Sequence, residues 1–392
     1  MSQPKILIVD DEPFNVNYLE QELEDLNYET ITAVNGKEAL EKIESEAPDL
    51  VLLDIMMPIM DGFTVLEKAK ANPVIRDIPI IIISANNDLQ SVVKGIKLGA
   101  EDYLPKPFEP TLLQARIQSS LEKKHLRDLQ DLYLKSLEKE LNIARDIQKE
   151  FLPKELPRVA GWEIASYFKA AKEVAGDFYD AFILPDGSLT FLVADVCGKG
   201  IGAALFMTLF RSLIRAASTT DQFSNQQDLK QFTHAQRLLH AVSLTNNYVT
   251  TTHAEAYMFA TIFIGILDTK NGNLTYINGG NEPALVIGKN GQVRTELPRT
   301  GPAIGVIPRT IFEAKQIMLA DDDMLVAFTD GIPDTLNINR EFFGRERMLK
   351  LIAKHKATPT ELVNKFETSL QEFIGSADQF DDITVLAIKK AI

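Results

Sequence analysis

The sequence predicts an α/β doubly wound parallel sheet of five strands, then a long connector helix, then an α+β region built on antiparallel strands. Three observations support this division. Up to about residue 120, short apolar runs alternate with amphipathic helical patterns. Residues 121–151 contain neither Gly nor Pro, as a continuous helix requires. Beyond them, many apolar runs are separated by turn signals and few helical patterns appear.

Strands and helices alternate in the N-terminal region, which indicates a parallel sheet covered on both faces. Val16–Leu26 and Gly36–Glu46 have the spacing of amphipathic helices between the strands. In such a sheet, ligands bind beyond the carboxyl ends of the strands. The expected strands are Lys5–Val9, Thr30–Val34, Leu50–Leu53, Pro79–Ser84 and Asp102–Leu104.

Length and charge narrow the class of protein. A chain of 392 residues exceeds the roughly 250–300 residues that one core serves, so we expect more than one domain. The net charge of −14 disfavours binding to nucleic acid or to an anionic membrane. The single cysteine, Cys197, excludes an internal disulfide. No signal-peptide pattern and no apolar run of roughly 18 residues is present, so we expect a cytoplasmic protein without a membrane span.

Residues 121–151 are predicted to form one continuous helix with an apolar stripe along one face. Pro153 is expected to end this helix. The stripe must be buried against a partner surface. We favour a dimeric coiled coil, and the alternative is a connector helix packed on its own domain. The stripe residues are Leu126, Leu129, Tyr133, Leu137, Leu141, Ala144, Ile147 and Phe151.

The C-terminal region predicts a mixed sandwich. Helical patterns occur at Ala203–Ala217 and Pro359–Phe373, and hairpin signals occur at 185–187, 271–273 and 289–291. The expected strands are Leu189–Ala194, Ala260–Asp268, Leu274–Asn278, Ala284–Gly288, Met324–Thr329 and Ile383–Ile388.

Acidic side chains follow neighbouring strands of the N-terminal sheet. Asp10 and Asp11 end the first strand and Asp54 ends the third, so three carboxylates meet at one edge. Mg²⁺ suits such a set because it takes a few carboxylates and retains water. Lys106 supplies positive charge for a phosphoryl group, and the Ser84 hydroxyl can hydrogen-bond one of its oxygens.

The segment from residue 4 to about residue 120 contains these side chains and resembles the response-regulator receiver family. The resemblance rests on ILIVDDEP, VLLDIMMPIMDG, Ser84 and LGAEDYLPKP. The resemblance implies that Asp54 is the phosphoacceptor for a sensor histidine kinase or phosphotransfer protein. It gives the Mg²⁺ ligands as Asp10, Asp11, Asp54 and the Met56 carbonyl. It gives the switch and phosphate-contacting residues as Ser84, Tyr103 and Lys106.

The C-terminal region carries acids in four separated motifs: EVAGDFYD with Asp177, ADVCGKG with Asp195, FTDG with Asp330, and DDITV with Asp381 and Asp382. Carboxylates without His or Cys favour Mg²⁺ or Mn²⁺ over Zn²⁺. Two such ions can activate a water and hold a phosphoryl group, which needs no protein nucleophile.

This set resembles the PPM-type serine/threonine protein phosphatases, in their SpoIIE-like stress-response branch, from about Ile143 to Leu386. ARDIQKEFLPKELP, YMFATIFIGILD and FFGRERM add to the likeness. The resemblance implies an αββα sandwich with two Mn²⁺ or Mg²⁺. It gives the catalytic metal ligands as Asp177, Asp195, Asp330 and Asp381. It adds the Val196 carbonyl as a ligand, Asp382 near a coordinated water, and Asp180 as a supporting residue behind the ligands.

Three positions depart from the family pattern. Gly280 stands where the family's histidine is expected, Cys197 stands in place of a serine, and Gly202 in place of a proline. None removes a metal carboxylate, so the departures bear on substrate fit or rate.

We therefore expect a receiver domain (1–121), a helical linker (122–153) and a phosphatase domain (154–392). In the family branch, the helix ending in the IQ…LP motif acts on the phosphatase core, so Asp54 phosphorylation is expected to control the metal site. The implied substrate is a phosphorylated STAS-type anti-sigma-factor antagonist, and the implied assembly is a homodimer. The alternative is a pseudophosphatase scaffold that sequesters a sigma factor or its regulator. A DNA-binding regulator is disfavoured, because no basic recognition helix follows residue 120.

Overall fold

The computed structural model describes residues 3–85, 89–219, 232–353 and 358–390. The chain forms two compact units, Met1–Leu137 and Glu138–Ile392, which we call the N-terminal and C-terminal units. The boundary lies inside a single helix, and each unit is described by itself.

The N-terminal unit is built on a five-stranded parallel sheet in the order β2-β1-β3-β4-β5, as the sequence predicted. The strand order reverses between β1 and β3, and this is the point where open α/β sheets bind ligands. The strands are β1 (Lys5–Val9), β2 (Glu29–Ala33), β3 (Leu50–Asp54), β4 (Ile80–Ala85) and β5 (Asp102–Lys106). The helices packed around it are α1 (Pro13–Asp25), α2 (Gly36–Glu46), α3 (Gly62–Ala71) and α4 (Leu89–Lys97).

Both faces of this sheet are covered by apolar side chains. Val51 and Leu53 of β3 belong to one core cluster, and Leu50 and Leu52 belong to the cluster on the opposite face. This explains why the strands appear in the sequence as continuous apolar runs, without polar alternation. The covered sheet fixes the strand ends that carry the site.

Helix α5 (Pro110–Phe151) is longer than the sequence predicted, because it starts at Pro110 and continues without a break through residue 121. A proline at the start of a helix lacks only an amide hydrogen that would have no intrahelical partner. Arg116 pairs with Asp102 at 2.6 Å, and Arg127 pairs with Glu101 at 3.0 Å, which fixes this helix to the N-terminal unit. Its predicted stripe is exposed between Leu126 and Leu137, where Leu126 is 59% and Tyr133 is 65% exposed, whereas Leu141, Ala144 and Phe151 are half-buried.

The C-terminal unit contains two five-stranded sheets whose strands pair antiparallel, ordered β13-β10-β9-β8-β7 and β12-β11-β14-β15-β6. The first sheet consists of β7 (Phe178–Ile183), β8 (Leu189–Val196), β9 (Ala260–Leu267), β10 (Asn273–Gly279) and β13 (Lys315–Met318). The second consists of β6 (Trp162–Lys169), β11 (Ala284–Ile287), β12 (Val293–Leu297), β14 (Met324–Phe328) and β15 (Ile383–Lys390).

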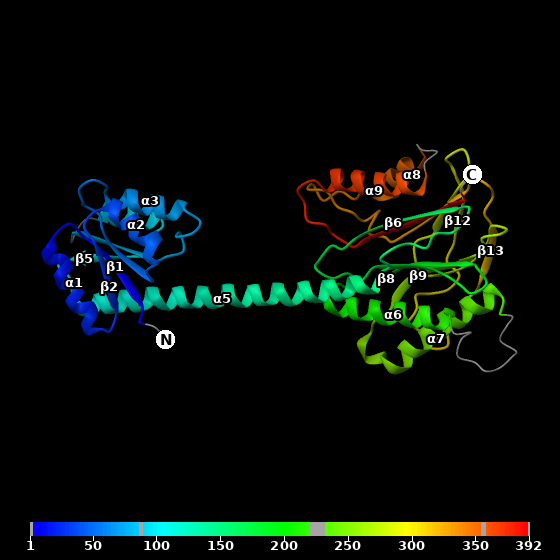
Figure 1. Ribbon diagram of the computed structural model, residues 1–392, viewed down its shortest axis with the longest axis horizontal. Helices are drawn as coiled ribbons and strands as arrows, with labels where there is room; N and C mark the ends of the chain where they lie inside the picture. Colours follow the sequence, from blue (N-terminus) through cyan, green and yellow to red (C-terminus); the bar gives the residue numbers. More distant parts are fainter. Residues whose placement is uncertain (1–2, 86–88, 220–231, 354–357, 391–392) are drawn as a thin grey trace. The chain divides into compact units, whose positions relative to one another are not determined.

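Helices cover the outer face of each sheet. Helices α6 (Ile201–Thr219) and α7 (His234–Thr252) lie on one side, and α8 (Gly344–Ala353) and α9 (Pro359–Ile374) lie on the other (Figure 1). A third core cluster with Phe191 and Leu386 fills the space between the sheets. This confirms the predicted αββα sandwich.

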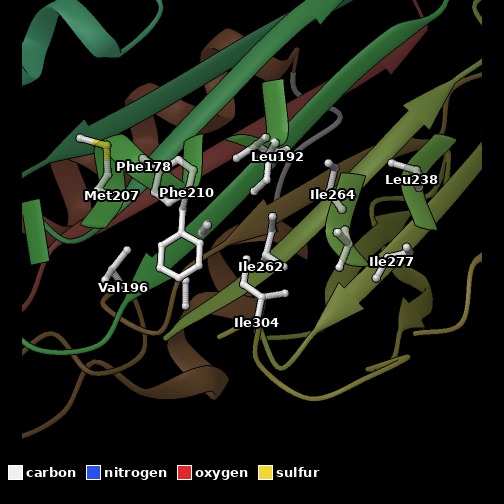
Figure 2. Packing of buried hydrophobic residues seen from close by; sticks show 14 of the residues in the cluster. Phe178, Leu192, Val196, Met207, Phe210, Leu238, Ile262, Ile264, Ile277 and Ile304 are labelled. Carbon is white, nitrogen blue, oxygen red and sulfur yellow. The ribbon is translucent and has the colours of Figure 1, made fainter. Parts of the chain in front are cut away.

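Helix α6 is the one helix in the described part of the chain whose length and hydropathy of 1.3 would permit a membrane span. Its apolar side chains have a different partner here. Met207 and Phe210 are fully buried against β-strand residues such as Leu192 and Ile262 (Figure 2). A helix at the core of a sandwich needs the same apolar composition.

Candidate functional sites

The first candidate site lies at the carboxyl ends of the N-terminal sheet. Asp10 follows β1, Asp54 ends β3, and Lys106 ends β5. The Lys106 ammonium lies 2.9 Å from both Asp10 Oδ2 and Asp54 Oδ1. One carboxylate oxygen from each of Asp10, Asp11 and Asp54 lies within 4.8 Å of the other two. The structure therefore brings together the three carboxylates and the lysine that the sequence indicated.

The electrostatics of this site suit a divalent cation. Burial raises the pKa of Asp54, and the charges of Asp10 and Asp11 raise it further, while Lys106 opposes the rise. Burial lowers the pKa of Lys106, but its hydrogen bonds to Asp10 and Asp54 outweigh burial, so this pKa is raised. One ammonium thus contacts two of the three carboxylates. Hard oxygen ligands with an excess of negative charge are the donor set that Mg²⁺ prefers.

The other residues that the sequence indicated lie on β4, on β5 and just after β3. Ser84 is buried near the end of β4, next to β5 in the sheet. Tyr103 is half-buried on β5, and the Arg116 guanidinium lies 5.5 Å from the centre of its ring. Met56, two residues after Asp54, is 80% exposed.

The second candidate site lies where the two sheets of the C-terminal unit meet. Asp177 precedes β7 and Asp195 lies in β8, both in the first sheet. Asp330 follows β14 in the second sheet, and Asp381 and Asp382 precede β15. We call these five residues the carboxylate cluster. The charges of Asp330, Asp381 and Asp382 all act on Asp195, which also interacts with Asp177, so four sequence motifs converge.

Two threonines connect Asp177 to the opposite sheet. The hydroxyls of Thr329 and Thr384 donate to Asp177 Oδ2 at 2.7 and 2.6 Å. Burial, together with the charges of Asp195 and Asp382, raises the pKa of Asp177 well above its usual range. The threonines were missed in the sequence, although each lies close to a motif acid, in FTDG and DDIT.

Burial and mutual repulsion raise the pKa of several members of the cluster. Burial, followed by the charges of Asp330 and Asp381, raises the pKa of Asp195 to about 7. Burial and the Asp381 charge raise the pKa of Asp330 as well. Buried carboxylates without a counter-charge are costly. Carboxylate oxygens are the donors that Mg²⁺ and Mn²⁺ take, and such ions would offset the repulsion within the cluster.

Asp382 holds the backbone of the site. Its carboxylate accepts hydrogen bonds from the amides of Ala171 at 2.7 Å, Gly176 at 2.7 Å and Asp177 at 3.3 Å. A Cβ at Gly176 would lie 2.7 Å from the Val196 carbonyl oxygen, and a Cβ at Gly331 would collide with the Asp382 carbonyl. The two glycines permit the close approach of the acid-bearing loops.

Asp180 faces away from the carboxylate cluster toward helix α6. It is fully buried and pairs with Arg211 Nη2 at 2.9 Å and Arg215 Nη1 at 2.8 Å. This ion pair fixes α6 to β7, so Asp180 supports the fold around the site.

The three departures from the family pattern have distinct environments. The Cys197 sulfur accepts a hydrogen bond from the Phe259 amide at 3.3 Å, and Gly202 has open space where a Cβ would stand. Gly280 has φ +81°, and a Cβ there would lie 2.9 Å from the Ala303 nitrogen. This geometry disfavours any side chain at 280. The adjacent Asn281 carries the buried polar group, donating to the Phe328 carbonyl at 3.0 Å.

The fold and the two carboxylate sites define a receiver module joined to a phosphatase fold of the PPM type. The chain belongs to the Stage II sporulation protein E (SpoIIE) family, whose model matches residues 185–391. Residues 6–118 match the response regulator receiver domain.

Curated proteins and solved structures resemble parts of this chain. The protein IcfG of Synechocystis sp. is 39% identical over 267 residues, which cover 64% of this chain and 41% of IcfG. The SiaA-PP2C domain of Pseudomonas aeruginosa has the same fold, with a TM-score of 0.55, 21% identity, and coverage of 66% of this chain and 98% of that domain. The RsbU and RsbW domains of Rv1364c from Mycobacterium tuberculosis align with a TM-score of 0.50, 23% identity, and coverage of 62% and 63%.

Proposed function

We propose that this chain is a metal-dependent protein phosphatase that hydrolyses phosphoserine or phosphothreonine under the control of Asp54 phosphorylation. The carboxylates of Asp177, Asp195, Asp330 and Asp381, with the Val196 carbonyl, hold two Mn²⁺ or Mg²⁺, and Asp382 lies near a coordinated water. When bound, such ions neutralise phosphoryl charge and lower the pKa of a bound water. The protein's own contribution is to place the ligands and to anchor the loops that carry them.

The convergence of four acidic motifs on Asp195 is the observation that supports this proposal. A buried set of like charges lowers the stability of a fold unless it binds cations. A binding scaffold has no use for such a set, whereas a phosphatase requires it. The Thr329 and Thr384 hydroxyls that hold Asp177 Oδ2 orient a ligand and give a scaffold no advantage.

We propose that the N-terminal site receives the signal. Asp54 accepts a phosphoryl group from a sensor histidine kinase or a phosphotransfer protein, with Mg²⁺ held by Asp10, Asp11, Asp54 and the Met56 carbonyl. Lys106, which lies 2.9 Å from Asp54, contacts the phosphoryl group. Ser84 and Tyr103 respond to it as the switch pair.

We propose that helix α5 carries the signal and pairs with a second copy. Residues 122–153 act as the linker between a receiver domain (1–121) and a phosphatase domain (154–392). The exposed stripe with Leu126 and Tyr133 supports a coiled coil over a helix packed on its own domain.

The proposed substrate is a phosphorylated STAS-type anti-sigma-factor antagonist in the cytoplasm. This part of the proposal rests on the stress-response branch of the family and on the fold shared with the RsbU domain of Rv1364c. The net charge of −14 is consistent with a protein substrate and not with nucleic acid.

Hydrolysis of para-nitrophenyl phosphate with Mn²⁺ tests the enzyme. Wild type should turn over, Asp330→Asn should lose at least about a hundredfold in kcat, as loss of a catalytic electrostatic group does, and Asp321→Asn should match wild type. Asp321 is the control because its side chain is 84% exposed and pairs with Lys390. Folded wild-type protein that neither binds Mn²⁺ nor hydrolyses the ester would favour the scaffold.

A further inference from the structure

Lys199 lies in the loop between β8 and α6 and reaches the carboxylate cluster. Its Nζ is 3.1 Å from Asp381 Oδ2. The same Nζ donates to the Phe380 carbonyl at 2.7 Å and lies 4.5 Å from the centre of the Phe380 ring. These contacts hold the ammonium at the rim of the site while its side chain stays 37% exposed.

Within the described ranges, Lys199 makes the one ion pair to any member of the carboxylate cluster. The positive charge of Lys199 also acts on Asp330 and works against the rise in the pKa of that carboxyl. Two arginines of the same unit pair with other carboxylates: Arg211 pairs with Asp180, and Arg345 pairs with Glu296. Lys199 is therefore the cation that the structure places against the carboxylate cluster.

Two glycines fix the loop around Lys199. Gly198 and Gly200 have φ of +86° and +81°, in the left-handed region that favours glycine. Lys199 therefore lies between two residues whose left-handed backbone conformation strongly favours glycine. A half-exposed ion pair adds little stability, so the Asp381 contact alone does not account for this arrangement.

We propose that Lys199 binds the phosphoryl group of the substrate, which deepens the proposed phosphatase function and rests on it. A cluster of carboxylates repels a phosphate dianion, and an ammonium at its rim offsets that repulsion. A divalent cation at Asp381 would compete with the ammonium for that carboxylate, and Lys199 would then be available to an incoming anion. Lysine binds phosphate as a point charge with three donors.

Binding of inorganic phosphate to the Mn²⁺-loaded full chain, followed by calorimetry, tests this inference. Lys199→Met should weaken phosphate binding and raise KM for para-nitrophenyl phosphate about tenfold, the factor given by 1.4 kcal/mol. Lys199→Arg should recover most of the loss. Lys289→Met, at an 80% exposed lysine paired with Asp322, should match wild type.

The affinity for Mn²⁺ separates this role from that of a structural residue. The Mn²⁺ affinity of Lys199→Met should equal or exceed the Mn²⁺ affinity of wild type, because the substitution removes a competing cation. Unchanged phosphate affinity and KM in Lys199→Met would overturn the inference, and so would weakened Mn²⁺ binding. Failure of the phosphatase itself is a separate outcome, recognised by a wild-type chain without turnover.

Discussion

Gln148 and Ala175 are joined by two hydrogen bonds in opposite directions. Gln148 Nε2 donates to the Ala175 carbonyl at 2.7 Å, and the Ala175 amide donates to Gln148 Oε1 at 3.0 Å. Gln148 is buried in the last turns of α5, and Ala175 stands two residues before Asp177. The end of the linker helix therefore holds the segment that carries a proposed metal ligand.

Loss of the two hydrogen bonds between Gln148 and Ala175 should weaken metal binding at the carboxylate cluster. Gln148→Ala leaves a buried amide and a buried carbonyl unpaired, each at a cost of about 1–3 kcal/mol. We expect a lower Tm and Mn²⁺ affinity reduced about tenfold, corresponding to 1.4 kcal/mol. Calorimetry with Mn²⁺ measures both affinities. Lys149→Ala, at the exposed neighbouring position, is the control and should behave as wild type. Equal Mn²⁺ affinity in Gln148→Ala and wild type would contradict this role.

Mn²⁺ binding should strengthen as the pH rises to about 7. The pKa of Asp195 is raised from 3.8 to about 7, by burial and then by the charges of Asp330 and Asp381, so a proton competes with the cation below that pH. The folded metal-free chain keeps a proton that the unfolded chain has lost. Its stability from this group therefore decreases as the pH rises from about 4 to about 7.

Thermal denaturation with and without Mn²⁺ measures this effect. The increase in Tm caused by Mn²⁺ should be larger at pH 8 than at pH 6. Asp321→Asn, which changes an exposed carboxylate outside the cluster, should keep the difference. An equal increase at both pH values would show that Asp195 does not exchange its proton for the metal.

Charges on the stripe of α5 should dissociate a dimer. Leu126→Glu with Tyr133→Glu places carboxylates on the apolar seam, where a coiled coil excludes water. We expect wild type to elute as a dimer and the double variant as a monomer, by light scattering coupled to size exclusion. Asp131→Ala changes an exposed position outside the stripe and should leave the dimer intact. A wild type that stays monomeric at high concentration would contradict the coiled coil.

The convergence of Asp10, Asp54 and Lys106 could be predicted from the sequence, because parallel strands place their carboxyl ends at the same edge of a sheet. Asp10 directly follows β1, Asp54 ends β3 and Lys106 ends β5, so the parallel sheet brings all three to one edge. The predicted αββα architecture was also confirmed. It could be predicted because apolar runs separated by turn signals indicate antiparallel strands. The start of α5 was placed too late, because the last helix of the receiver continues without a sequence signal into the linker.

The contacts that organise the second site were harder to predict, because they join segments distant in sequence. Asp382 holds the amide of Gly176, 206 residues away, and Lys199 reaches Asp381 from another motif. The sequence offers a signal for Lys199, a lysine between two glycines directly after Asp195 in ADVCGKG. The sequence offers no such signal for Ala175, the partner of Gln148, because nearly every residue type carries the same backbone amide and carbonyl.

The central claim is that phosphorylation of Asp54 changes the phosphatase rate. Initial rates of para-nitrophenyl phosphate hydrolysis should be measured for wild type and Asp54→Ala, each with and without a small-molecule phosphodonor and Mg²⁺. The account predicts that the donor changes the wild-type rate several-fold, as a differential binding energy of about 1 kcal/mol would produce, and leaves the Asp54→Ala rate unchanged. Equal wild-type rates with and without the donor, under conditions where Asp54 is shown to be phosphorylated, would contradict it.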